Sequence, residues 1–75
     1  GLILNAANEI SVEYFLEDKI SYLDIPNIIE DILDSGDVVE HDTLDSIIEN
    51  DREIRELTRN YIKTRYSFSV EIGSD

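Results

Sequence analysis

An amphipathic stripe in the first half of the chain constrains its fold more than any other feature. Apolar residues recur there at positions i, i+3, i+4, i+7 and i+8, which is the spacing of one face of an α-helix. These residues are Ile25, Ile28, Ile29, Ile32 and Leu33. We expect a helix from Asp24 to Gly36, with Ser21 and Asp24 as candidate caps and Pro26 in the first turn, where its missing N–H costs nothing. Gly36 is expected to take positive φ at the helix end.

A second stripe lies near the end of the chain. Its apolar members are Ile54, Leu57, Tyr61 and Ile62, and the polar Thr58 stands among them. The stripe predicts a helix from about Asp51 to Thr64 or beyond. Asp51 is expected to cap it, and Lys63 and Arg65 lie late in it, where cations suit the helix dipole.

A shorter stripe comes just before the second one. Its members are Leu44, Ile47 and Ile48, and they predict two helical turns that begin at Asp42 or Thr43. We expect Asn50 and Asp51 to form a corner between this short helix and the next.

The first segment, residues 4–17, is apolar on more than one side of a helix, which is typical of a central helix. With short connections between the elements, residues 1–66 are expected to form an all-α bundle of three to four helices. The expected core is Ile10, Phe15, Ile25, Ile28, Ile29, Ile32, Leu33, Ile47, Ile48, Leu57 and Ile62. Phe68, Val70 and Ile72 alternate in the tail, residues 67–75, which we expect to be either disordered or a docked strand.

Composition excludes several classes of protein. The chain of 75 residues has no cysteine and one histidine, so it has no disulfide and little with which to build a zinc site. Its net charge of -12 repels phosphate backbones and anionic lipid, so we expect neither nucleic acid nor membrane as a partner. We see no spanning helix or signal peptide, and a cytoplasmic location is the default expectation.

Polar residues near the start of the chain invite two interpretations. Asn5, Asn8 and Glu9 could bind a sugar or a metal. A structural role explains them better, with Asn5 or Asn8 at a helix start or bonding to a loop, and Glu9 returning a hydrogen bond to a backbone N–H in a capping box. We therefore count Asn5, Asn8, Glu9, Asp24 and Asp51 as structural residues. We assign no catalytic, cofactor-binding or metal-binding residue.

An acidic run with one histidine follows the first stripe. Asp34, Asp37, Glu40 and Asp42 flank His41, but their spacing does not follow the calcium-loop pattern, and a solvated loop is the better interpretation.

The stretch from Leu4 to Leu16 contains the run Asn-Ala-Ala-Asn-Glu and ends in Phe-Leu, and Tyr22-Leu23-Asp24-Ile25 follows after a short gap. This pattern resembles the beginning of the C-terminal region of the 1-deoxy-D-xylulose 5-phosphate reductoisomerase family. The later residues from Leu44 to Ile48, with Asp51 and Arg55, are similar to the closing helices of that region. The resemblance covers positions 4 to about 62.

The resemblance implies a fragment of a larger, dimeric enzyme of isoprenoid biosynthesis. Such an enzyme has an NADPH-binding domain, a catalytic domain that holds a divalent metal (Mg or Mn) and the sugar phosphate, and a four-helix C-terminal domain. The family's metal ligands and phosphate-binding side chains precede the matched stretch, so none is carried onto this chain. Gly1, Gly36 and Gly73 form no dinucleotide-binding pattern either.

An apolar inventory this large in so short a chain predicts that one face packs against the catalytic domain, and that the isolated chain self-associates through that face. The alternative is a free-standing acidic interaction module or an acyl-carrier-like protein. Asp45-Ser46-Ile47 is the motif that favours the carrier, with Ser46 as the attachment site, although the glycine expected before that site is missing.

Overall fold

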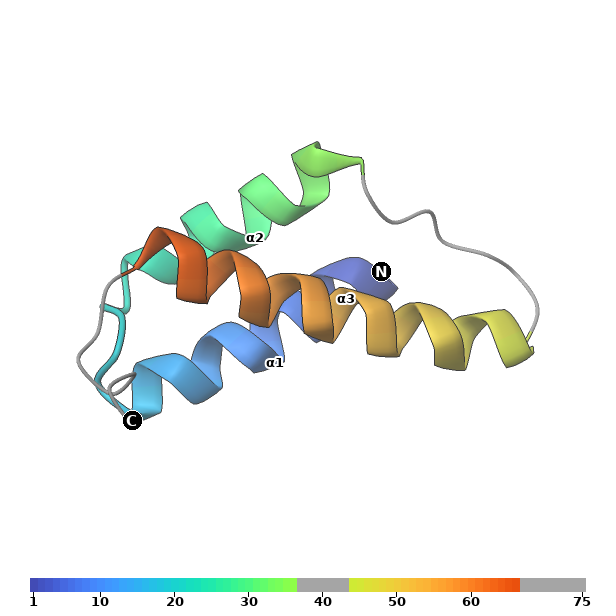
Figure 1. The fold of residues 1–75 in the computed structure, drawn as a ribbon, viewed down its shortest axis with the longest axis horizontal. Coiled ribbons are helices and arrows are strands. Elements are labelled where there is room, and N and C mark those ends of the chain that lie inside the picture. Colours follow the sequence, from blue (N-terminus) through green and yellow to red (C-terminus); the bar gives the residue numbers. More distant parts are fainter. Residues whose placement is uncertain (37–43, 67–75) are drawn as a thin grey trace.

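The structure, a computed structural model, describes residues 1–36 and 44–66. Within these ranges the chain forms α1 (Leu2–Leu16), α2 (Asp24–Ser35) and α3 (Leu44–Arg65), as Figure 1 shows. The described elements are all helical, which confirms the predicted fold class. The tail at 67–75, His41 with its acidic neighbours from 37 on, and the candidate caps Asp42 and Thr43 lie outside the described residues.

Helix α1 is the central element of the bundle. It packs extensively against both α2 and α3, whereas α2 and α3 share a smaller contact. The prediction of a central first helix is therefore confirmed, because a helix that is apolar on several sides can cover two neighbours at once.

A backbone motif ends α1. Asp18 takes a left-handed conformation at φ 63°. Its N–H donates to the carbonyl of Phe15 at 3.0 Å, and the N–H of Lys19 donates to that of Tyr14 at 3.0 Å. This is the Schellman arrangement, which satisfies carbonyls left open at a helix end and turns the chain toward α2.

The bounds of α2 agree with the sequence prediction, but the predicted capping by Ser21 or Asp24 is wrong, because Leu23 is the N-cap and no side chain caps the helix. The Asp24 carboxylate accepts hydrogen bonds from the backbone N–H of Ser21 at 2.8 Å and from its hydroxyl at 3.1 Å. These contacts hold the turn that leads into the helix. At the other end Gly36 has φ 68°, in the left-handed region that glycine adopts without steric cost.

The predicted corner at Asn50 and Asp51 is wrong, because α3 runs through it as one helix of 22 residues. Asn50 is buried, with its amide 3.4 Å from the Glu53 carboxylate, and Asp51 binds Arg55 instead of capping a helix. Asn and Asp cost a helix only about 0.7 kcal/mol each relative to Ala, which packing and these contacts easily offset.

The core lies where the three helices meet. Five of its predicted members are buried: Ile10, Ile25, Ile28, Ile32 and Ile62. Three more are half-buried and pack against this core: Phe15, Ile29 and Leu57. Sequence reasoning left out four buried members: Ala6, Ala7, Ile20 and Ile54. Two of the four are alanines, which add little to a hydrophobic stripe but allow close helix approach.

Three residues expected in the core are exposed. Leu33 is 48% exposed, Ile47 38% and Ile48 58%. Ile47 stands seven residues before the buried Ile54 and therefore faces the same way on α3. In Figure 1 this first part of α3 extends beyond α1 and α2, so no described helix lies there to cover it.

Within the described ranges, none of the helices has the length and apolar content that crossing a membrane requires.

Candidate functional site

An apolar groove runs between α1 and α2. It encloses about 760 Å³. Its lining residues are Leu4, Asn8, Val12, Tyr22, Ile25, Pro26, Ile29, Glu30 and Leu33. Leu4 is 47% exposed and Tyr22 67% exposed, so much of this surface is nonpolar and faces water. We call it the α1–α2 groove.

The polar groups of the α1–α2 groove are few. Only Asn8 and Glu30 contribute a polar side chain besides the Tyr22 hydroxyl. Because most of its lining is apolar, the groove is suited to receiving apolar side chains.

The other side of α1 is closed by α3. Ile54 and Thr58 are fully buried, and the Thr58 hydroxyl donates to the carbonyl of Ile54 at 2.7 Å. Ser11 of α1 is also fully buried and donates to the carbonyl of Ala7 at 2.8 Å. Each buried hydroxyl thus finds a partner within its own helix, which removes the cost of its burial. We call this contact between the two helices the α1–α3 seam.

An ion pair joins α1 and α3 at the edge of the α1–α3 seam. The Arg55 guanidinium donates to Glu9 of α1 at 2.7 Å and to Asp51 of α3 at 2.7 Å. Hydrogen bonds to these two carboxylates, first to Asp51 and then to Glu9, raise the pKa of Arg55 above its usual value, so the guanidinium stays charged. The sequence already placed Asp51 and Arg55 at i and i+4, but the reach to Glu9 needed the fold.

The capping roles predicted for Asn5, Asn8 and Glu9 are wrong. Helix α1 begins at Leu2 with Gly1 as its N-cap, so these residues lie inside the helix. Glu9 binds Arg55, as described above. Asn5 and Asn8 are exposed on α1 with their amides free of hydrogen bonds to the described residues.

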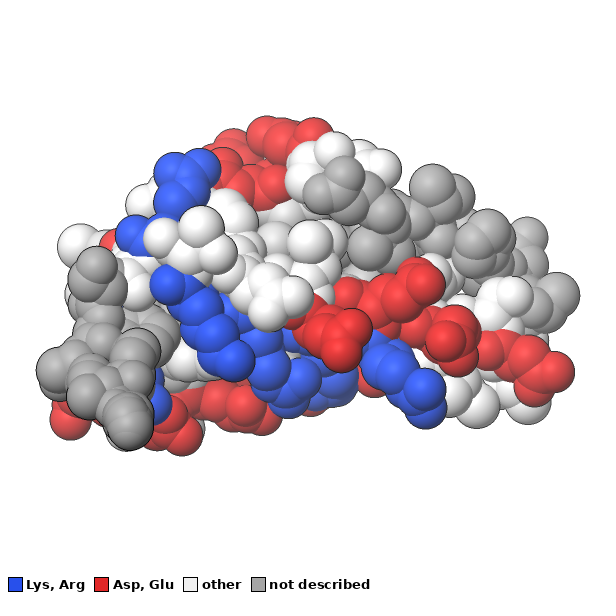
Figure 2. Space-filling view, viewed as in Figure 1, with Lys and Arg blue, Asp and Glu red and all other residues white. Residues whose placement is uncertain are grey.

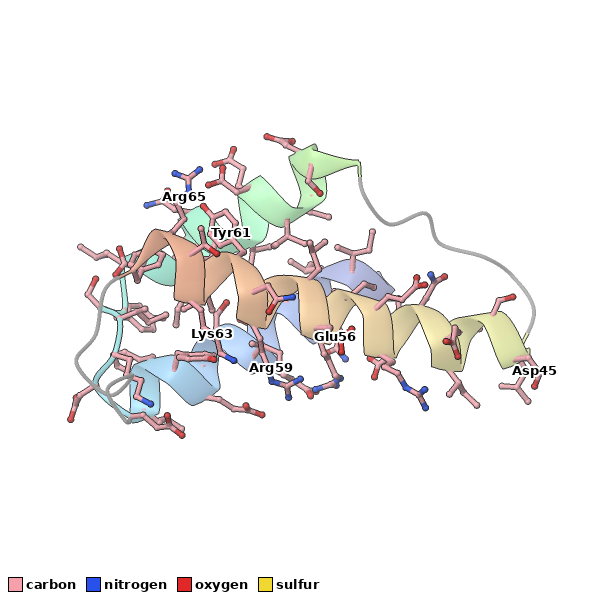
Figure 3. The ribbon with its side chains drawn as sticks, in the orientation of Figure 1. Asp45, Glu56, Arg59, Tyr61, Lys63 and Arg65 are labelled. Atoms are coloured by element: carbon pink, nitrogen blue, oxygen red, sulfur yellow. The ribbon has the colours of Figure 1, made fainter. Side chains whose placement is uncertain are left out.

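A polar contact joins α3 to α2. The Tyr61 hydroxyl donates to the Asp31 carboxylate, and the Arg65 guanidinium lies 5.1 Å from the Tyr61 ring centre. Burial, followed by this hydrogen bond, raises the pKa of Tyr61 to about 12. Figure 3 shows Tyr61 and Arg65 on the α2 side of α3, and Arg59 and Lys63 on the α1 side.

Charge is divided along α3. Asp45 lies in its first turn, and Lys63 and Arg65 lie in its last turn. Figure 2 shows the basic side chains as a row along the helix and the acidic ones toward its first half. This order matches the helix dipole and stabilises the long helix.

No site for a nicotinamide cofactor or a metal is seen among the described residues. Among residues 1–36 and 44–66, no three His, Cys, Asp or Glu side chains come together as metal ligands. Gly36 ends α2 and does not stand between a strand and a helix, where a dinucleotide-binding turn would need it.

Fold and groove together define a small acidic helical domain with one apolar face left open. The chain belongs to the family of DXP reductoisomerase C-terminal domains, whose family model matches residues 1–57. The resemblance inferred from the sequence is thereby confirmed.

Relatives support the same assignment. The 1-deoxy-D-xylulose 5-phosphate reductoisomerase of Ruthia magnifica is 45% identical over 62 residues, which cover 83% of this chain and 16% of the relative. The enzyme of Clostridium perfringens strain SM101 is 46% identical over 65 residues, which cover 87% of this chain and 16% of the relative. That of Leptospira biflexa gives the same values. The chain thus spans about one sixth of these relatives, and no solved structure matches it.

Proposed function

We propose that this chain is the C-terminal helical segment of an NADPH-dependent reductoisomerase, which converts 1-deoxy-D-xylulose 5-phosphate to 2-C-methyl-D-erythritol 4-phosphate in isoprenoid biosynthesis. Family membership and the names of the relatives support this proposal. In this proposal NADPH binding, the divalent metal and catalysis belong to the rest of the enzyme, since the match takes up only 16% of such a relative. The segment itself contributes no catalytic residue.

The role that we propose for this segment is to brace the catalytic domain through the α1–α2 groove. The open groove carries this proposal, because Leu4 and Leu33 each leave about half of their surface in water. Covering the remaining half of a leucine side chain is worth about 1 kcal/mol. A small domain with a thin stability margin gains substantially from such a cover.

No structural observation favours the carrier alternative. Ser46 lies in the first turn of α3, and the family match from 1 to 57 already includes it and its neighbours.

A chimera tests the bracing role. The matching 65 residues of the Clostridium perfringens enzyme are replaced by this chain, and Leu33→Asp is introduced into the chimera and into the isolated chain. A carboxylate in a covered apolar groove loses its water, so we expect the melting temperature of the chimera to fall by about 2–5 °C and its turnover to drop. In the isolated chain, at a concentration too low for self-association, about half of this residue already faces water, so the substitution should cost less than about 1 kcal/mol.

Asn60→Asp is the matched control, because Asn60 is exposed on α3 away from the groove. It should leave both proteins unchanged. A chimera that does not fold, or one that tolerates Leu33→Asp as well as Asn60→Asp, rules out the bracing role.

The same groove supports self-association of the isolated chain. We expect sedimentation to show a concentration-dependent dimer that is favoured by salt, since salt screens the repulsion between copies of net charge -12. Leu33→Asp should shift the population to monomer. A wild-type chain that stays monomeric at millimolar concentration contradicts this expectation.

A further inference from the structure

We infer that Asn5 and Asn8 bind the backbone of an extended polypeptide segment that crosses the start of α1. The inference rests on the proposed function and names the kind of partner that lies at this end of the α1–α2 groove. It also accounts for two residues of the Asn-Ala-Ala-Asn-Glu run that capping does not explain.

The two amides form one small surface. A shallow pocket of their own is lined by Gly1, Leu4, Asn5 and Asn8, and it shares Leu4 and Asn8 with the α1–α2 groove. Both side chains are exposed, and neither makes a hydrogen bond within residues 1–36 and 44–66. The surface therefore offers unused hydrogen-bonding groups directly beside an apolar one.

The spacing of the amides suits a peptide backbone. Residues at i and i+3 on a helix lie about 5–6 Å apart. Along one edge of an extended strand, outward-facing N–H and C=O groups repeat every two residues, or about 6.6–6.8 Å. Each asparagine amide both donates and accepts, so each can bind one N–H and C=O pair of such an edge.

The charges argue for a neutral partner. The chain as a whole carries a net charge of -12, so a phosphate or carboxylate ligand would be repelled. A peptide backbone carries no net charge and escapes this repulsion. The relatives contain ample chain to provide it, since the matched region is only 16% of their length.

Helix propensity makes the test decisive. Asparagine is a poorer helix former than alanine, so exposed asparagines in a helix normally gain stability when replaced by alanine. We therefore prepare Asn5→Ala/Asn8→Ala in the isolated chain and in the chimera described above. The melting temperature of the isolated chain should rise by about 2–6 °C. That of the chimera should fall by about 1–4 °C, because backbone groups of the partner segment lose their hydrogen bonds.

Asn60→Ala is the control for this experiment, since it makes the same replacement at an exposed position of α3. It should raise the melting temperature of both proteins. A rise in the chimera for the double variant as well would overturn the inference. So would an unchanged melting temperature with a several-fold higher KM for the sugar phosphate, which would assign the amides to a small ligand.

Failure of the inference and failure of the proposed function are distinguishable. If the chimera responds to Leu33→Asp but gains stability from the asparagine replacements, the groove is covered and only the backbone contact is wrong. If the chimera ignores Leu33→Asp, the bracing role itself fails, and the inference fails with it.

Discussion

The two sides of α1 differ in how completely their side chains are buried and hydrogen-bonded. On the α1–α3 seam, apolar side chains are buried, buried hydroxyls have partners, and Arg55 joins both helices through carboxylates at 2.7 Å. On the α1–α2 groove, Leu4 and Leu33 remain about half exposed beside polar groups without such a network. One helix thus serves as an internal scaffold on one side and as an open surface on the other.

The difference separates residues that stabilise this segment from residues that act outside it. Closed packing contributes to the folding of the chain alone, because its contacts lie within the chain. Exposed apolar surface contributes nothing until something covers it. In the isolated chain, truncations that remove a similar number of atoms should therefore reduce the free energy of unfolding by different amounts on the two sides.

The largest expected effect is at the centre of the seam. Ile54→Ala removes three buried carbons from a fully buried site and should cost about 2–4 kcal/mol of unfolding free energy, enough to unfold much of the population. Leu33→Ala in the groove should cost less than about 1 kcal/mol. Urea unfolding followed by circular dichroism measures both, and equal losses would erase the proposed distinction.

A smaller effect is expected at Arg55. Arg55→Met keeps the aliphatic part of the side chain but removes both ion pairs, which should cost about 1 kcal/mol, since a partly exposed pair is worth less than a buried one. The loss should shrink in 1 M salt.

A double-mutant cycle with Glu9→Gln isolates the contact across the seam. If the two substitutions are strictly additive, the Glu9–Arg55 pair does not hold the helices together.

The smallest effect is expected at the contact between α2 and α3, and it depends on pH. An unfolded tyrosine ionises near pH 10, whereas burial and the hydrogen bond to Asp31 raise the pKa of Tyr61 to about 12. The stability that this shift provides is fully present below pH 10 and is lost as pH rises through about 12. Tyr61→Phe should therefore flatten the fall in stability between pH 10 and 12.

Part of that fall should persist in Tyr61→Phe, because burial also raises the pKa of Tyr66. Tyr22→Phe, at an exposed site, is the control and should keep the full slope. An identical slope in Tyr61→Phe and wild type would show that the contact with Asp31 is not maintained in solution.

Local patterns predicted the helices well where one signal dominated. The stripe from Ile25 to Leu33, with Asp24 and Gly36 at its ends, gave α2 with its correct start and stop. The prediction of a corner at Asn50 failed because the weak local preferences of Asn50 and Asp51 were outweighed by the burial of Asn50 and by side-chain contacts along the helix. Periodicity also does not reveal length: Ile47 faces the same way as Ile54, yet it lies beyond the described end of the bundle.

The candidate site was only partly predictable. An excess of apolar residues over what a short chain can bury indicated an open face, but which residues formed it depended on how α2 lies on α1. Leu33 was expected in the core because the sequence does not show how α2 lies on α1, yet it is 48% exposed. Glu9 was recognised as structural, but its partner Arg55 lies 46 residues away, and only the fold brings them together.

The unbroken course of α3 makes its rotational phase a fixed property of the whole domain. Each residue of an α-helix turns the following ones by about 100°. One residue inserted near Asn50 would swing Tyr61 away from Asp31 and turn Ile62 out of the core, although every side chain remained in the protein. The segment around Asn50 should therefore tolerate many substitutions but very few insertions or deletions.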